Sequence, residues 1–379
     1  INLNTFPLNA LPILTVEQTR QIAQNVAAAR GLTFDPNQGL NVVAVGDQLR
    51  NPRSFQLGAA FEREVMSGVT MGVTYDHVNT VHLNINRDLN VGVPVIRAGD
   101  LSQRPFYNIQ GTGAGRPLPN LGFVQIREAS GRSNYDALTF RGQMRKKWGQ
   151  FDAFYTLARN LDNDSTERNA TFATYDDSFN LVPEYNYSSS DRRHQFTYNT
   201  VLNLPLGFQW ASLGRFRSGV PVDVTVSSII APTGSGLSNQ QFANAVTLTN
   251  STSGDLNLDR GNFADRPYIA PGVSSKRNSF RNRAVYNIDM RLQRDIKWGE
   301  RYSLSPTLEV FNIFGFKNIQ YASTTVLNYG NPGINEETGA VLGPSNPNFL
   351  QLRNAAGDLI LNNLPGQPRQ VQVGLRFKF

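Results

Sequence analysis

Hydrophobic and polar residues alternate along several stretches of the chain, most clearly at the C-terminus. There, five apolar residues alternate with four others: Val371, Val373, Leu375, Phe377 and Phe379 against Gln372, Gly374, Arg376 and Lys378. Successive side chains of a β-strand point to opposite faces of its sheet, so this segment is predicted to be a strand with one apolar and one polar face. The stretches that begin at Tyr286 and Tyr302 repeat the pattern.

Earlier stretches of the same kind bring the prediction to about ten strands. They cover residues 53–62, 68–77, 120–128, 135–146, 150–160, 192–204 and 207–218. A tilted transmembrane β-strand needs about 9 to 11 residues, and each stretch has about that length or more. The alternation is weakest in 120–128.

The connections between these strands alternate in length. Connections of a few residues around Ser67, Trp148, Pro205 and Lys297 are separated by connections of about 30 to 65 residues. Short periplasmic turns and longer extracellular loops are typical of outer-membrane barrels. The sequence therefore predicts an all-β fold: a partial antiparallel transmembrane β-barrel with long extracellular loops and short periplasmic turns.

The three tryptophans lie near these predicted short turns. Trp148 and Trp298 each stand in a Lys-Trp-Gly sequence, and Trp210 follows the turn at Pro205. Amphipathic aromatic rings gather where a membrane meets water. We expect these tryptophans to be interfacial aromatics on the periplasmic rim.

Residues 1–50 contain no convincing strand. Thr15 and Gln18 form a capping-box pattern, and Gly31 follows as a stop signal, so a short helix is predicted between them. We expect residues 1–50 to be an extracellular loop region and residues 51–379 to be the barrel. An extracellular start requires an earlier strand, so the chain is expected to be the C-terminal portion of a larger barrel.

The composition excludes several other classes of protein. Mean hydropathy is −0.35 and no apolar run reaches the roughly 18 residues of a spanning helix. The chain has no cysteine, which excludes thiolate metal sites and disulfides. The net charge is +7, but the lysines and arginines are dispersed, which argues against nucleic acid as a partner.

The histidines do not form a convincing catalytic group. Asp76 precedes His77, but adjacent strand residues point to opposite faces, so Asp76 cannot orient His77. Asp191 lies close to His194 in the sequence, with no nucleophile indicated. We predict no catalytic residue, no cofactor and no metal site, and hence no enzyme.

A calcium loop is the one metal alternative. Asp162, Asp164 and Thr166 occupy alternate positions, as oxygen ligands of calcium can. Glu167 stands at the sixth position, where a calcium loop of the EF-hand type has glycine. A solvated acidic loop is the favoured interpretation.

Charged residues on the polar faces of the last strands are candidates for the barrel interior. The lumen-facing candidates are Asp289, Arg291, Glu309 and Arg376. Both signs of charge are expected where polar side chains satisfy one another or contact material inside a barrel.

Several motifs resemble one family, the TonB-dependent receptors of the Oar-like type in Gram-negative bacteria. They lie at residues 51–58 (NPRSFQLG), 133–138 (SNYDAL) with 145–147 (RKK), 190–196 (SDRRHQF), 217–221 (RSGVP), 287–290 (NIDM), 308–314 (LEVFNIF) and 368–377 (PRQVQVGLRF). Together they extend from about residue 51 to the end of the chain.

The resemblance implies a transporter of the outer membrane. Such a receptor has about 22 strands around an N-terminal plug, and a TonB-type energy-transducing complex pulls on the plug. It also implies that the outer-membrane assembly machinery recognises the terminal strand, through Val371, Val373, Leu375, Phe377 and Phe379. The sequence shows neither a plug nor a TonB box, so the plug and the missing strands are expected partners from the parent protein, alongside outer-membrane lipid. The ligand is not identified.

Two other classes stay open. A passive porin or surface adhesin would be a self-contained small barrel, and a secreted β protein would be soluble without detergent. The sequence before Ile1 distinguishes the transporter from the small barrel. A plug-like domain and further strands favour transport, whereas a signal peptide joined directly to Ile1 favours the small barrel.

The predicted facing of the terminal strand can be tested by charge insertion. Val373→Arg and Leu375→Arg should each impair membrane insertion by about 2 to 4 kcal/mol near the midplane, while Gln372→Arg should be mild because Gln372 is predicted to face the interior. The amount of folded barrel in outer-membrane fractions measures the effect. Equal effects at odd and even positions would contradict the facing.

Overall fold

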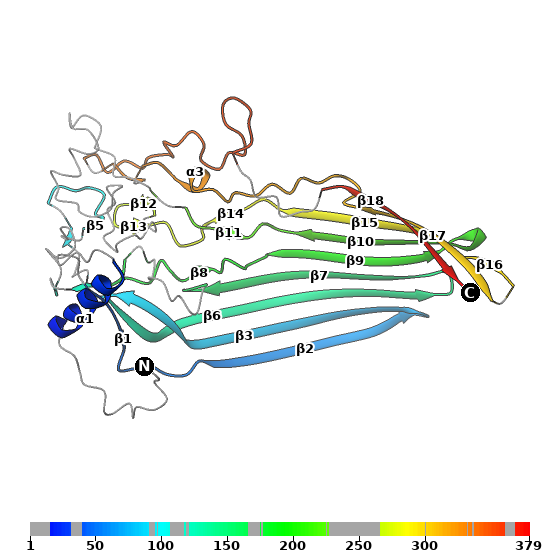
Figure 1. Ribbon diagram of the computed structural model, residues 1–379, viewed down its shortest axis with the longest axis horizontal. Coiled ribbons are helices and arrows are strands. Elements are labelled where there is room, and N and C mark those ends of the chain that lie inside the picture. Colours follow the sequence, from blue (N-terminus) through cyan, green and yellow to red (C-terminus); the bar gives the residue numbers. More distant parts are fainter. Residues whose placement is uncertain are drawn as a thin grey trace.

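The long strands of the protein form one large antiparallel sheet in the computed structural model (Figure 1). The structure describes residues 16–31, 40–90, 95–96, 98–106, 117–118, 121–165, 175, 177–224, 226, 266–299, 301–331, 333–335, 337–360 and 368–379. The nine long strands are β2 (Arg53–Met66), β3 (Val69–Asp88), β6 (Leu121–Lys146), β7 (Gly149–Asp162), β9 (His194–Asn203), β10 (Phe208–Arg217), β15 (Val285–Arg294), β17 (Tyr302–Phe311) and β18 (Gln370–Lys378).

Each long strand pairs with the next one along the chain. The order across the sheet is β2, β3, β6, β7, β9, β10, β15, β17, β18. Strand β16 (Ile296–Trp298) continues β15 beyond Asp295, since both pair with β17. Within the described residues β2 pairs only with β3 and β18 only with β17, so the sheet has two open edges.

The short and long connections lie at opposite ends of the sheet, as the sequence predicts. The turns that join β2 to β3, β6 to β7, β9 to β10 and β16 to β17 lie at one end (right in Figure 1). Toward the other end lie the helices α1 (Val16–Ala29) and α3 (Thr324–Leu327) and the short strands. These strands are β4 (Val95–Ile96), β5 (Pro105–Phe106), β8 (Asn186–Tyr187), β11 (Pro221–Val222), β12 (Tyr268–Ala270), β13 (Val273–Ser274) and β14 (Phe280–Arg281).

The turn between β2 and β3 needs a glycine. Gly68 has φ 68°, and a Cβ atom there would lie 2.3 Å from the carbonyl oxygen of Arg145. Glycine adopts positive φ without steric cost and lets the neighbouring strand approach closely.

Cross-strand register divides the sheet into an apolar and a polar face. One row across seven strands is almost entirely aromatic: Phe61, Val73, Phe140, Tyr155, Phe196, Phe216 and Tyr286. A row on the opposite face is polar: Thr74, Thr139, Thr156, Gln195 and Arg217. The apolar row is open to the surroundings, with Phe61 65% exposed.

Aromatic rings pack against glycine on the apolar face. The Tyr198 ring covers Gly214 on the neighbouring strand, where a Cβ atom would lie 2.0 Å from the ring. Neighbouring rings hold Tyr198 in place: its centroid is 6.2 Å from that of Phe151 and 6.5 Å from that of Phe216.

The prediction of two strands at 120–128 and 135–146 was wrong, because these residues form the single strand β6. The residues between them include Gly131 and look like a turn, but they pair with an extended β3. The register shifts at Leu83, next to His82 with its φ of 62°. Bulges of this kind interrupt the alternation that sequence reading depends on. The described sheet therefore has nine long strands rather than about ten.

The N-terminal region contains both an expected and an unexpected element. Helix α1 lies inside the predicted range and is followed by Gly31 at φ 66°, while Thr15 lies outside the described residues. The expectation of no strand before residue 51 was wrong, because β1 (Leu40–Val45) pairs in parallel with the first part of β6. The boundary between residues 50 and 51 stays a prediction.

The packing of Tyr198 predicts different effects for two glycines on the apolar face. Gly214→Ala should lower stability by about 1 to 3 kcal/mol, because the new methyl displaces a ring that its neighbours hold. Gly142→Ala is the matched control, since a Cβ atom there meets nothing within 4 Å. Unfolding midpoints in detergent measure both. A larger loss for Gly142→Ala would contradict this packing.

Candidate functional site

The four lumen candidates lie on the polar face of adjacent strands. Arg291 stands opposite Glu309, with 3.7 Å between Arg291 Nε and Glu309 Oε1. Arg376 stands opposite Ser305 on the same face of β17 as Glu309. Asp289 accepts the backbone N–H of Asn312 at 2.8 Å, at the end of β17. The structure therefore brings the four candidates onto one face, and their role in the interior stays a prediction.

The polar face has a second group of charged residues, which the sequence did not predict. Both carboxylate oxygens of Asp152 on β7 accept hydrogen bonds from Arg145 Nη2 on β6, at 2.8 and 2.9 Å. Gln143 donates to the same carboxylate at 2.7 Å. Arg145 and Asp152 are seven residues apart across a hairpin, so only the turn register brings them together. Paired charges of both signs make this face hydrophilic.

The loop end of the sheet contains a buried charge cluster. The Arg266 guanidinium donates to both Glu184 oxygens, at 2.7 and 3.0 Å, and its Nε donates to Asp223 at 3.0 Å. The side chains of Arg266 and Glu184 are each 1% exposed. Charges so deeply buried are tolerated only when each is paired and hydrogen-bonded.

Two more arginines extend this cluster. Arg277 binds Asp162 and donates to Ser165 Oγ at 2.8 Å. Arg281 donates to Asp191 at 2.6 Å. With Arg266, they join the connection after β7 to the connection between β10 and β15. We name Arg266, Glu184, Asp223, Arg277, Asp162, Arg281 and Asp191 the loop cluster. It ties two long connections into one unit.

The proposed calcium ligands have protein partners. Asp162 binds Arg277, and Asp164 accepts the hydroxyl of Tyr175 at 3.3 Å. Burial and the Asp164 carboxylate raise the pKa of Tyr175 well above its usual value, so this hydroxyl stays protonated and can donate. Thr166 lies outside the described residues, among which no group of three potential metal ligands occurs.

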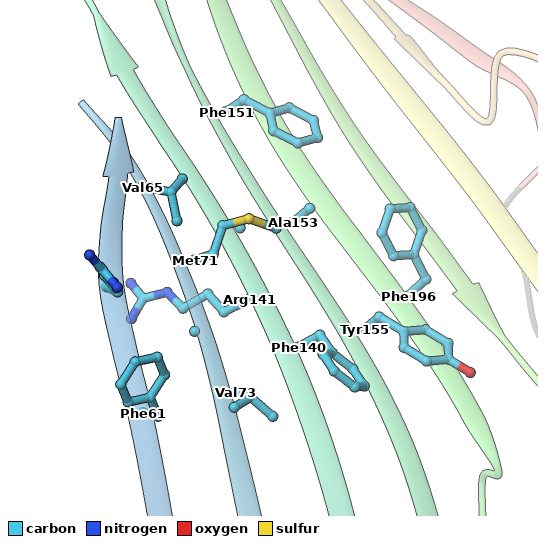
Figure 2. Close-up of a pocket in the computed structure, with 13 residues that line it drawn as sticks. Phe61, Val65, Met71, Val73, Phe140, Arg141, Phe151, Ala153, Tyr155 and Phe196 are labelled. Atoms are coloured by element: carbon cyan, nitrogen blue, oxygen red, sulfur yellow. The ribbon is translucent and has the colours of Figure 1, made fainter. Parts of the chain in front are cut away.

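A groove of about 550 Å³ crosses the apolar face (Figure 2). Its floor is formed by small residues on neighbouring strands, Gly142 and Ala153, which stand opposite each other. Larger side chains from β2, β3, β6, β7 and β9 surround the floor: Phe61, Met71, Phe140, Phe151, Tyr155 and Phe196. The groove is therefore shaped for hydrocarbon rather than for a polar solute.

A family model described as an outer membrane beta barrel domain matches residues 2–372. The chain belongs to this family. It is therefore an outer-membrane protein of a Gram-negative bacterium, and its antiparallel barrel fold agrees with the prediction. In such barrels the apolar face contacts lipid. No helix in the described part of the chain is long and apolar enough to cross a membrane.

Three solved structures are similar to this barrel at low identity. The iron transporter FrpB of Neisseria meningitidis (F3-3 variant) has 10% identity and TM-score 0.41, covering 89% of this chain and 33% of FrpB. FpvA of P. aeruginosa, bound to a heterologous pyoverdine, has 10% identity and TM-score 0.39, with coverages of 86% and 27%. The transporter YddB of Escherichia coli has 8% identity and TM-score 0.39, with coverages of 74% and 31%.

The chain thus spans about a third or less of each of these proteins. The comparison with curated proteins found no match.

The histidines of the barrel pair across strands. His77 Nδ1 lies 2.7 Å from Asp136 Oδ1, and the Tyr75 hydroxyl donates to the same oxygen at 2.9 Å. Asp76 stands on the opposite face, as expected from strand geometry. His194 Nδ1 lies 2.8 Å from the Tyr155 hydroxyl, while Asp191 binds Arg281 instead. Sequence spacing contained no signal for the pair with Asp136, which is 59 residues from His77.

The predicted interfacial aromatics all lie toward the turn end of the barrel. Trp148 lies in the turn after β6 and is 54% exposed, and Trp298 ends β16 and is 52% exposed. Trp210 lies within β10, opposite Leu202 and Leu292. Their function as membrane anchors stays a prediction.

The residues of the predicted assembly signal lie on the edge strand β18 or just beyond it. Their side chains are all exposed: Val371, Val373, Leu375, Phe377 and Phe379. Phe377 stacks on Tyr302 with 6.2 Å between the ring centroids. Recognition of this strand by the assembly machinery stays a prediction.

From the ion pairs of the loop cluster, we predict that neutralising one carboxylate will loosen the connection after β7 and the connection between β10 and β15. Glu184→Gln should destabilise the cluster by about 3 kcal/mol, because the buried Arg266 guanidinium loses the negative charge of the carboxylate that accepts two of its hydrogen bonds. Hydrogen–deuterium exchange of residues 177–191 and 266–281 should become faster. Glu337→Gln, at an exposed loop position, is the control and should leave these rates unchanged. Unchanged exchange in Glu184→Gln would refute the predicted role of the cluster.

Proposed function

We propose that this chain is the barrel portion of a TonB-dependent transporter that binds ligand with its extracellular loops and passes it through a plugged interior. The observation that carries the proposal is the polar face of the sheet, which bears charges of both signs. The Oar-like motifs from residue 51 onward agree with it.

The polar face supports transport because it offers a hydrated wall. The pairs Arg145 with Asp152 and Arg291 with Glu309 lie on different strands of this face. A polar interior is expected for a barrel that holds water, a plug or a polar solute.

The loop cluster supports ligand capture by the connections it holds. Long loops in compact folds are uncommon unless they are functional. Binding by pre-ordered loops costs less conformational entropy than binding by loops that order on contact. The cluster gives the connections after β7 and β10 such order. We expect the connections at 220–282 and 317–367 to contact the ligand; residues 225, 227–265, 332, 336 and 361–367 of these connections lie outside the described residues.

The proposed partners follow from the same assignment. The open edges of β2 and β18 fit pairing with further strands of the parent protein, and the polar face fits contact with a plug. The TonB-type energy-transducing complex would act through that plug, and the assembly machinery would recognise β18. The protein would act as a carrier and not as an enzyme.

A passive porin or surface adhesin is the alternative, and electrical conductance separates it from a plugged transporter. The full-length protein, reconstituted in a planar lipid bilayer, should show no stable conductance, because a plug blocks the interior. Reversible unfolding of the plug by urea added on one side should open large channels. A stable open conductance of the untreated protein would instead establish the porin.

A further inference from the structure

We propose that the barrel binds the phosphate-bearing headgroup of an outer-leaflet lipid in a pocket at the extracellular end of β15. The pocket has a volume of about 300 Å³. Two cations, Arg283 and Lys317, and two aromatic residues, Tyr286 and Phe316, line the pocket. The other lining residues are Ala284, Asn318 and Ile319. The inference needs only the outer-membrane location and is independent of the proposed transport.

Side-chain amides join the two segments that line the pocket, residues 283–286 and 316–319. Asn318 accepts the N–H of Tyr286 at 2.9 Å and donates to its carbonyl at 2.8 Å. Gln320 donates to the carbonyl of Arg283 at 2.7 Å. Both amides are buried. They extend the pairing beyond the last backbone pair of β15 and β17, and Arg283 and Lys317 line the same pocket.

The aromatic contacts place the pocket on the lipid-facing side. Tyr286 is the last member of the aromatic row on the apolar face, with its ring 6.0 Å from that of Phe216. Phe316 packs 5.7 Å from Tyr286, and Phe314 packs 5.7 Å from Phe316. These rings lie at the end of β15 opposite the Trp298 turn. The pocket therefore lies at the extracellular rim, at the level of outer-leaflet headgroups.

The charges indicate what the pocket binds. Arg283 and Lys317 are exposed, and their side chains have no carboxylate partner within the described ranges. By contrast, Arg266, Arg277 and Arg281 of the loop cluster each bind an acid. Two cations in the lining of one pocket match a phosphate through charge-assisted hydrogen bonds. The neighbouring rings offer an apolar surface to the acyl chains of the same lipid.

Binding of a diphosphorylated lipid A to the full-length protein in detergent tests the proposal, with native mass spectrometry as the readout. The double variant Arg283→Gln/Lys317→Gln should bind it at least about tenfold more weakly than the unaltered protein. Each single substitution should give a smaller loss. Exposed cations without partners are not needed for folding, and heat-modifiable migration on a gel verifies that the variants are folded.

The controls separate this pocket from general charge attraction and from free phosphate. The matched control Lys297→Gln/Arg301→Gln removes two exposed cations at the opposite rim and should leave binding unchanged. Dephosphorylated lipid A should bind the unaltered protein as weakly as the phosphorylated lipid binds the double variant. Equal binding by the double variant, an equal loss in the control, or full displacement of the lipid by millimolar inorganic phosphate would each overturn the proposal.

Discussion

Backbone hydrogen bonding is the constraint on which the rest of this protein depends. No water is present in a bilayer core to bond exposed N–H and C=O groups, so a strand that crosses it must be paired on both sides within the protein. The antiparallel ladders meet this requirement for the long strands from β3 to β17, while β2 and β18 are each paired on one side within the described residues. Pairing in a fixed register also aligns every second side chain across the sheet. The aromatic row and the polar row are therefore consequences of the same ladders, and neither can shift without the other.

At the loop end of the sheet, side-chain contacts rather than backbone ladders hold the chain together. Its connections have little regular pairing, and the short sheets there contribute few ladder bonds. Buried arginine–carboxylate pairs replace the ladders as the specific contacts. Removing one partner would leave a charge without compensation, so the cluster favours a single arrangement of the connections. In these connections, charge pairs between side chains thus provide the specific contacts that backbone pairing provides in the sheet.

The sequence was sufficient for the parts of the fold with strict alternation. Strand β18, the short turns at Ser67 and Pro205, and the common face of Arg291 and Glu309 follow from period two alone. The continuity of β6 did not, because Gly131 and the bulge beside His82 interrupt that period. Cross-strand partners such as Asp136 for His77 depend on register, which spacing along the chain does not encode. The loop cluster joins Glu184 to Arg266 over 82 residues, and no local pattern marks such a pair.

The lengths of β3 and β6 have a mechanical consequence. At about 3.3 Å per residue, the 20 residues of β3 span roughly 66 Å, and a tilt of about 40° leaves roughly 50 Å along the membrane normal, more than the roughly 30 Å of a bilayer core. At the end of this strand pair farthest from the short turns, polar residues of β3 and β6 pair with each other, among them Arg87 with Glu128. By its length, this part of the β3–β6 pair extends beyond the bilayer core. Strand β1, which pairs with residues 121–127 of β6, is therefore held clear of the membrane surface, where molecules in the medium can approach it without first displacing lipid.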